Sequence, residues 1–189
     1  MEKQFNFIIE SELPCSKQSK SLGLVNFESL CKFVKNIPYG RTKNRNTLTS
    51  ILTENKGTCS SKHAFLKQVA IENNQNDIKL FIGIYKMNET NTKGVGNVLK
   101  NYNLEYIPEA HTYLKMNAKI IDITRETTSL ISFEDTLLFE EQILPNQITD
   151  YKVSLHQRFL KQWVIDEGKT EDLKKIWHIR ELCIAALSA

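Results

Sequence analysis

One cysteine in this sequence lies where a helix is expected to begin. Apolar residues recur at helical spacing from about Thr58 to Asn73, and Thr58 suits the N-cap position, so Cys59 falls in the first turn. Backbone N–H groups at a helix start favour a thiolate, the form of cysteine that attacks carbonyl groups. Cys59 therefore has two interpretations: a nucleophile, or a buried structural cysteine.

A histidine and an aspartate further along the chain could assist such a nucleophile. Two short strand-like runs predict a hairpin that turns at Met116 and Asn117, and this register places His111 directly opposite Asp122. Directly opposed residues share a face of the sheet, with Cβ atoms about 4.5–5.5 Å apart. The carboxylate could then accept the imidazole N–H and leave the other ring nitrogen for a thiol. The alternative is a surface His–Asp pair without a catalytic role.

Other spacings do not predict a metal or cofactor site. Cys59 and His63 are one helical turn apart, but a metal needs two more ligands, and no other cysteine or histidine is arranged to supply them. Gly94-Val95-Gly96 lacks the third glycine and the strand-to-helix context of a dinucleotide site. We expect no metal and no cofactor.

The elements that must position these residues predict an α+β fold with an antiparallel sheet. Ser11–Ser21 is polar and contains Pro14, which is typical of a loop, and Glu126–Asp150 is rich in acidic residues and is typical of irregular structure. The expected helices cover about Leu22–Ile37, a short segment ending at Leu52, Thr58–Asn73 with Phe65, Leu66, Val69 and Ala70 buried, Val153–Glu167 and Glu171–Leu187. The expected strands are Phe5–Ile9, Ile78–Met87, Ala110–Met116 and Ala118–Thr124.

Composition narrows the class of protein. The 189 residues are 41% hydrophobic and 25% charged, which suits one folded domain that needs no metal or disulfide. The net charge of +3 is too small to argue for nucleic acid or an anionic membrane. The longest apolar run, about Leu80–Tyr85, is far shorter than a membrane span, and no signal-peptide pattern or disulfide framework is present. We therefore expect a single soluble, cytoplasmic domain over residues 1–189.

A basic run surrounds the cysteine. Between Lys32 and Lys62 there are seven lysines and arginines against one acid, Glu54, a net charge of +6. This patch could steer an anionic substrate or contact a partner, although charged segments are usually just solvated.

The region from Ile37 to Arg125 resembles the transglutaminase-like superfamily. The resemblance rests on four short pieces in the family's order Cys, His, Asp. The first piece is Asn46–Leu52 followed by Asn55–Cys59, similar to the short helix and Gly-x-Cys of the family, and the second is Phe81–Tyr85, similar to the family's next strand. The third is His111-Thr112-Tyr113, similar to the family's His-Ala-Trp, and the fourth is Asp122-Ile123-Thr124, similar to its Asp-Pro-Thr. The acidic and aromatic residues that often follow the family's cysteine are replaced here by Ser60-Ser61-Lys62-His63.

The resemblance implies a papain-like α+β core at about residues 22–125, in which the nucleophile begins a core helix packed on the antiparallel sheet. A C-terminal helical extension follows at about residues 153–188. Cys59 would be the nucleophile, His111 the general base and acid, and Asp122 its orienting partner. The oxyanion would meet the Cys59 N–H and a side-chain donor, for which Asn46 ranks ahead of Asn44 and Tyr39.

The implied function is cysteine-dependent acyl transfer at amide bonds through a thioester. The acyl-enzyme could be resolved by water, as in a peptidase, amidase or deamidase, or by an amine, as in a transglutaminase. The partner would be a peptide or amide substrate, free or within a protein, and neither nucleic acid nor membrane is expected. The alternative is a catalytically idle transglutaminase-like protein that binds a partner through the basic patch of residues 32–62. The sequence does not determine the oligomeric state.

Overall fold

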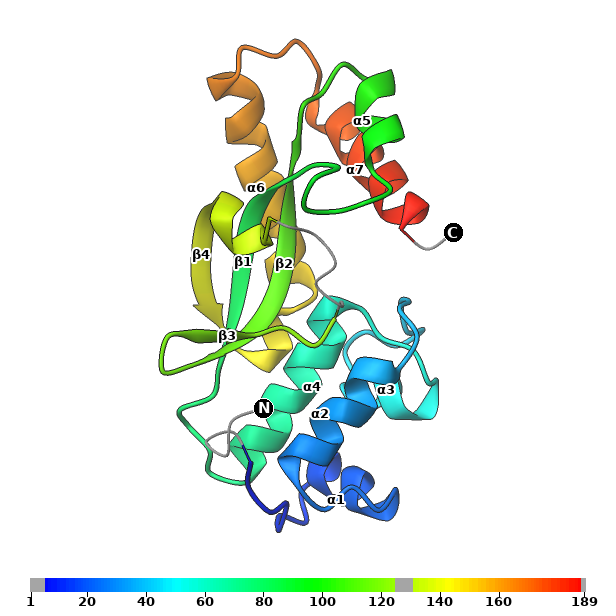
Figure 1. Ribbon diagram of the computed structural model, residues 1–189, viewed down its shortest axis with the longest axis vertical. Coiled ribbons are helices and arrows are strands. Elements are labelled where there is room, and N and C mark those ends of the chain that lie inside the picture. Colours follow the sequence, from blue (N-terminus) through cyan, green and yellow to red (C-terminus); the bar gives the residue numbers. More distant parts are fainter. Residues whose placement is uncertain (1–5, 125–130, 188–189) are drawn as a thin grey trace. The chain divides into compact units, whose positions relative to one another are not determined.

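The structure is a computed structural model that describes residues 6–124 and 131–187. Over these residues the chain forms α-helices and a four-stranded antiparallel sheet of order β3-β2-β1-β4, so the expected α+β class is confirmed (Figure 1). The helices are α1 (Pro14–Ser21), α2 (Phe27–Asn36), α3 (Ser50–Thr53), α4 (Cys59–Glu72), α5 (Gly96–Asn101), α6 (Asp150–Asp166) and α7 (Leu173–Ala186). The strands are β1 (Lys79–Met87), β2 (Ile107–Met116), β3 (Lys119–Ile121) and β4 (Leu137–Ile143).

The chain divides into two compact units, each assembled from three segments. Unit 1 comprises Met1–Phe81, Thr112–Glu126 and Gln142–Thr149, and unit 2 comprises Ile82–His111, Thr127–Glu141 and Asp150–Ala189. β1 and β2 contribute residues to both units. The expectation of a single domain stays a prediction.

α4 is the helix around which unit 1 is organised. It begins where the sequence predicts, because the Thr58 side chain accepts a hydrogen bond from the Ser61 N–H and the Ser61 hydroxyl accepts one from the Thr58 N–H. The predicted inner face of the helix is fully buried, and α1, α2 and α3 pack against it (Figure 1). The helix that carries the cysteine was therefore predicted correctly.

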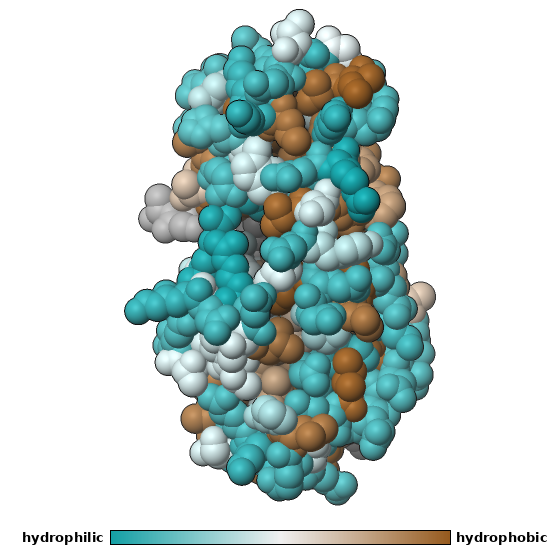
Figure 2. Space-filling view, turned by 180° about the vertical axis from the view of Figure 1, so that it is seen from behind, coloured by the Kyte–Doolittle hydropathy of each residue, from teal (hydrophilic) through white to brown (hydrophobic). Residues whose placement is uncertain are grey.

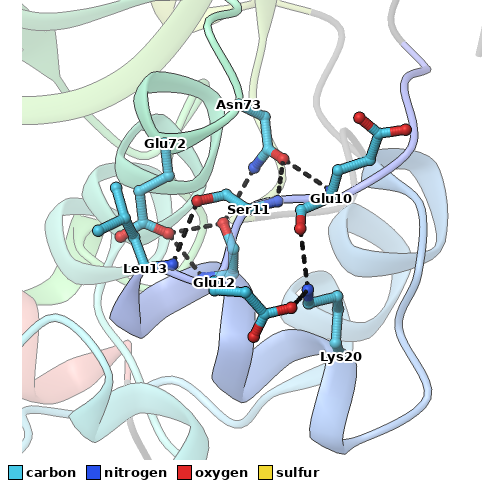
Figure 3. A network of polar contacts seen from close by, with 8 residues as sticks. Glu10, Ser11, Glu12, Leu13, Lys20, Glu72 and Asn73 are labelled. Atoms are coloured by element: carbon cyan, nitrogen blue, oxygen red, sulfur yellow. Dashed lines mark hydrogen bonds and ion pairs between the residues drawn. The ribbon is translucent and has the colours of Figure 1, made fainter.

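α1 forms in a segment expected to be a loop, so that expectation was wrong. Pro14 occupies the start of the helix, where a missing N–H is tolerated. The carboxylate of Glu72, at the end of α4, accepts hydrogen bonds from the N–H groups of Cys15 and Ser16 at 3.2 and 2.7 Å. The next residue, Asn73, holds the backbone just before α1 (Figure 3). The cap of α1 thus comes from residues distant in sequence.

The hairpin of β2 and β3 differs in register from the expected one. Its turn is Asn117-Ala118, both with positive φ (50° and 63°), which is the conformation of a tight two-residue hairpin turn. The strand pairing is therefore displaced by two residues from the predicted alignment. β3 ends at Ile121, so Asp122 follows the paired strand and is not paired opposite His111. The predicted register was wrong because the turn lies one residue later than expected.

Unit 2 has its own hydrophobic core. Side chains of α6 and α7 pack with those of β1 and β2 around Trp163, Ile176 and Cys183. α6 runs along the sheet, and its Phe159 ring lies 6.3 Å from that of Phe139 in β4 (Figure 1). The region expected to be irregular thus contains β4, together with the 3-10 helices Phe133–Thr136 and Pro145–Gln147.

The remaining differences concern the ends of elements. The first long helix begins at Phe27 rather than Leu22, because Asn26 caps it by accepting a hydrogen bond from the Ser29 N–H. Phe5 lies outside the described residues, and Ile8 forms only an isolated bridge with Asn26. In the face drawn in Figure 2, hydrophilic residues predominate and hydrophobic patches lie between them.

Candidate functional site

Cys59 is the first residue of α4, in unit 1. It is 7% exposed, and Gly57 precedes its N-cap. A Cβ on Gly57 would lie 3.0 Å from the Lys62 side chain and 3.2 Å from the Ser61 hydroxyl, so glycine allows the chain to enter the helix at this point. At the first turn of a helix the backbone N–H groups point outward along the axis, and their partial positive charge favours a thiolate at Cys59.

Lys62 is a buried cation one turn beyond the cysteine. Only 2% of it is exposed, and its ammonium group donates hydrogen bonds to the carbonyls of Lys35 and Ile37 at 3.1 and 2.5 Å, at the C-terminal end of α2. Burial lowers the pKa of Lys62, and the negative charges available at Cys59 and Asp122 oppose that shift. An ammonium group that interacts with Cys59 in this way favours the thiolate.

Ser60 ties the start of α4 to the sheet. Its hydroxyl lies 3.2 Å from that of Thr112 in β2 and 3.8 Å from the Cys59 sulfur. Thr112 belongs to unit 1, so this contact lies within one unit. It fixes the first turn of α4 against β2.

His63 is a fully buried histidine that links Cys59 to Asp122. Its Nε2 accepts a hydrogen bond from the Ile123 N–H at 3.0 Å, so Nδ1 carries the proton and donates to the Cys59 carbonyl at 2.9 Å. The Asp122 carboxylate lies 3.5 Å from the same Nε2 and accepts a hydrogen bond from the Thr124 N–H at 2.8 Å. Both ring nitrogens of His63 are therefore engaged in hydrogen bonds within the fold.

His111 belongs to unit 2, whereas Cys59 and Asp122 belong to unit 1. Its side chain is 7% exposed and packs edge-on against Phe133 and Tyr85, with ring centroids 4.9 and 6.4 Å away. Unit 1 thus brings Cys59 and Asp122 together through His63, and the catalytic role predicted for His111 stays a prediction.

The other cysteines are buried in environments that disfavour a thiolate. Burial raises the pKa of Cys15 and of Cys31 to about 12, and that of Cys183 to about 11. Cys15 also lies beside the Glu72 carboxylate, which raises its pKa further. These three thiols are protonated and unreactive at neutral pH.

The candidates for the oxyanion donor occupy different places in unit 1. Tyr39 forms an isolated β-bridge with Gly57, and the Gly57 N–H donates to the Pro38 carbonyl at 3.0 Å. The backbone of Pro38 and Tyr39 therefore pairs with a residue two positions before Cys59. Asn46 instead lines a groove together with Gln68 of α4. Its role as an oxyanion donor stays a prediction.

The basic run is less of a surface patch than the sequence predicts. Lys62 is buried, Lys32 pairs with Glu28 at 2.8 Å, and Lys56 lies 3.6 Å from Glu54. Lys43 and Arg45, in the loop before α3, are among the cations of this run that are exposed. Lysine and arginine counts alone could not separate the buried cation from the exposed ones.

One signal for this site was present in the sequence. Lys62 lies four residues before Leu66 and seven before Val69, which places it on the buried stripe of α4. A lysine on that stripe predicts a buried ammonium with a specific partner. The Ser60–Thr112 contact had no comparable signal, because it depends on the packing of α4 against β2.

The described residues contain no group of three or more His, Cys, Asp or Glu side chains that could hold a metal. In the same residues no helix is long and apolar enough to span a bilayer. Comparison with known protein families, with curated proteins and with solved structures finds no match for this chain.

Proposed function

We propose that this protein is a cysteine-dependent acyl-transfer enzyme of the transglutaminase-like type, with Cys59 as its nucleophile. The observation that carries the proposal is the position of Cys59 at the start of α4, where the buried ammonium group of Lys62, one turn further along the helix, interacts electrostatically with it. A helix N-terminus and a nearby cation are the two features that most commonly convert a cysteine into a thiolate. The pKa values of the other three thiols are raised, so Cys15, Cys31 and Cys183 are poor candidates for a nucleophile.

The proposed chemistry acts on an amide bond. The Cys59 thiolate attacks the carbonyl carbon, and the C–S bond forms as the C–N bond breaks. Protonated His111 gives its proton to the leaving amine and then, as a neutral base, takes a proton from the water or amine that resolves the thioester. The oxyanion is met by the Cys59 N–H and by a side-chain donor, for which Asn46 and Tyr39 are the candidates to be tested.

His111 is the better candidate for the base because both nitrogens of His63, the histidine one turn after Cys59, are used within unit 1. Thr112, the residue after His111, contacts Ser60 through its hydroxyl, and a regular strand turns consecutive side chains to opposite faces. The pairing of His111 with the thiol is therefore the step that needs a direct test. Asp122 would orient the imidazole, as the resemblance implies.

The test is mass spectrometry of the intact protein incubated with a panel of glutamine-containing peptides and simple amides. We expect a single acyl adduct on Cys59 that decays in water or transfers to added primary amine. Cys59→Ser should abolish the adduct and leave the melting temperature within a few degrees. His111→Ala and Asp122→Asn should slow acylation by at least about 100-fold.

Three controls separate mechanism from folding. A limiting amount of iodoacetamide near pH 6.5 should label Cys59 ahead of Cys15, because burial keeps the latter protonated. Asn46→Ala and Tyr39→Phe should identify the oxyanion donor, because only replacement of the true donor lowers the acylation rate without changing the rate of thiol alkylation. Equal labelling of Cys15 and Cys59, or full acylation in His111→Ala, would contradict the proposal.

A further inference from the structure

Unit 1 contains a second candidate site, a groove of about 560 Å³ on the far side of α4 from the cysteine. Gln68 and Ile71 of α4 line it, nine and twelve residues after Cys59. At about 100° and 1.5 Å per residue, Gln68 lies about 180° around the helix and about 13 Å along it from Cys59. The part of the groove formed by α4 therefore lies away from Cys59, although Asn46, an oxyanion-donor candidate, also lines the groove.

The walls of the groove combine an apolar surface with unengaged polar groups. Ile71, Leu144 and Ile148 supply apolar surface, and the first two are 37% and 56% exposed. In the described part of the chain, the side chains of Arg45 and Asn146 make no hydrogen bond or ion pair with other residues. Apolar walls with a few converging polar groups, at this volume, are characteristic of a ligand site.

The charge of the groove indicates the sign of its ligand. Arg45 is the only charged residue among those that line it, and no acid lies among them. Two acids of the flanking elements already have partners: Glu72 caps α1 and accepts a hydrogen bond from the Gln68 amide at 3.5 Å, and Glu54 accepts hydrogen bonds from the Lys43 N–H. A carboxylate placed beside Arg45 would meet a complementary charge without a competing partner.

The polar groups favour a peptide over a small carboxylate. Asn46, Gln68 and Asn146 each carry an amide donor and an acceptor along the groove, and one Gln68 N–H donates to Glu72 Oε1 at 3.5 Å. A peptide backbone also alternates donors and acceptors, whereas a small dicarboxylate has only acceptors and would leave the amide oxygens unpaired. We propose that this groove binds an extended peptide segment in which an acidic side chain on Arg45 is flanked by aliphatic side chains on Ile71 and Leu144.

The test uses immobilised octapeptides with a fixed central Glu, Gln or Lys and flanking positions randomised among Leu, Ser and Gly. We expect the full-length protein to bind the Glu set most strongly and the Lys set least. Arg45→Gln should weaken binding to the Glu set by about threefold to tenfold and remove the preference for Glu over Gln. Ile71→Ser should weaken binding of the leucine-containing peptides in every set.

The controls distinguish this site from the catalytic one. Lys43→Gln removes an exposed positive charge from the same loop without touching the groove and should leave binding unchanged. Cys59→Ala should also leave it unchanged, so failure of the acyl-transfer proposal would not affect this result. Equal binding of the Glu and Lys sets, no binding of any set, or displacement of the peptides by glutarate at comparable concentration would each overturn the proposal.

Discussion

A buried ion pair in unit 2 leads to a quantitative prediction about folding and pH. Arg180 of α7 donates two hydrogen bonds to Glu109 of β2, from Nε at 2.7 Å and from Nη2 at 2.5 Å. Burial alone would raise the pKa of Glu109, but the charge and hydrogen bonds of Arg180 outweigh burial and lower it to about 2. Glu109 lies two residues before His111, so this pair also anchors the strand that carries the proposed base.

The magnitude follows from the shift of the pKa. A carboxyl group whose pKa falls from 4.5 to about 2 on folding contributes about 3 kcal/mol to the free energy of unfolding above both values. Because the folded pKa is depressed, this contribution is fully present above about pH 5 and is lost as pH falls toward 2. The pKa of buried His156 is lowered by burial, so its titration also weakens the fold as pH falls.

The perturbation is Glu109→Gln, which leaves the buried Arg180 guanidinium with only the partly exposed Glu181 as its counter-ion. We expect a loss of about 3–5 kcal/mol in the free energy of unfolding at pH 7, and a smaller difference from the parent protein at pH 3. Urea titration followed by tryptophan fluorescence is the assay, because Trp163 and Trp177 both belong to unit 2. Glu181→Gln is the matched control: it pairs with the same arginine at 2.6 Å but is 34% exposed, and should cost less than about 1 kcal/mol.

A double variant makes the prediction refutable even if the single variant unfolds. Glu109→Leu with Arg180→Met removes both charges, and similar apolar replacements of buried pairs are often tolerated. It should therefore be more stable than Glu109→Gln. If Glu109→Gln cost no more than Glu181→Gln, or if its deficit were the same at pH 3 and pH 7, the buried pair would not contribute as argued.

Two further predictions concern unit 1. Lys62→Met removes the ammonium group that binds the Lys35 and Ile37 carbonyls and interacts with Cys59. It should destabilise the protein by about 1–3 kcal/mol in thermal or urea unfolding and slow the alkylation of Cys59 at pH 6.5. Unchanged alkylation would show that the cation does not favour the thiolate. Glu72→Gln removes the charge that caps α1 and should lower the free energy of unfolding by about 0.5–2 kcal/mol. Glu10→Gln, at an exposed position, should leave the free energy of unfolding unchanged. An equal effect of both variants would contradict the capping argument.

The sequence was most informative where structure depends on neighbouring residues. α4 combines a helical apolar repeat with a Thr58 cap, and both signals lie within one segment, so its start and its buried face were predicted. The C-terminal helices were predicted for the same reason, although α6 begins three residues before the expected position. The candidate nucleophile depended only on this local pattern, and its place at the helix start is confirmed.

The errors arose where partners are distant in sequence or where one turn sets many contacts. α1 depends on Glu72, more than fifty residues away, and its own polar sequence was typical of a loop. The hairpin register depends on which two residues adopt positive φ, and an error of one residue in that choice displaced every predicted cross-strand pair by two. β4 was missed because its acidic residues obscure the alternation of exposed and buried positions along the strand.

The start of α4 is held by interactions that do not require a substrate. The Thr58–Ser61 capping box fixes the first turn, Ser60 joins it to β2, and His63 joins its first carbonyl to the segment after β3. A nucleophile must be presented in one orientation if its thiolate is to meet a carbonyl at the correct angle, and rigid support achieves this before binding. These interactions hold the first turn of α4 whether or not Cys59 reacts, and they would present the proposed nucleophile in one orientation.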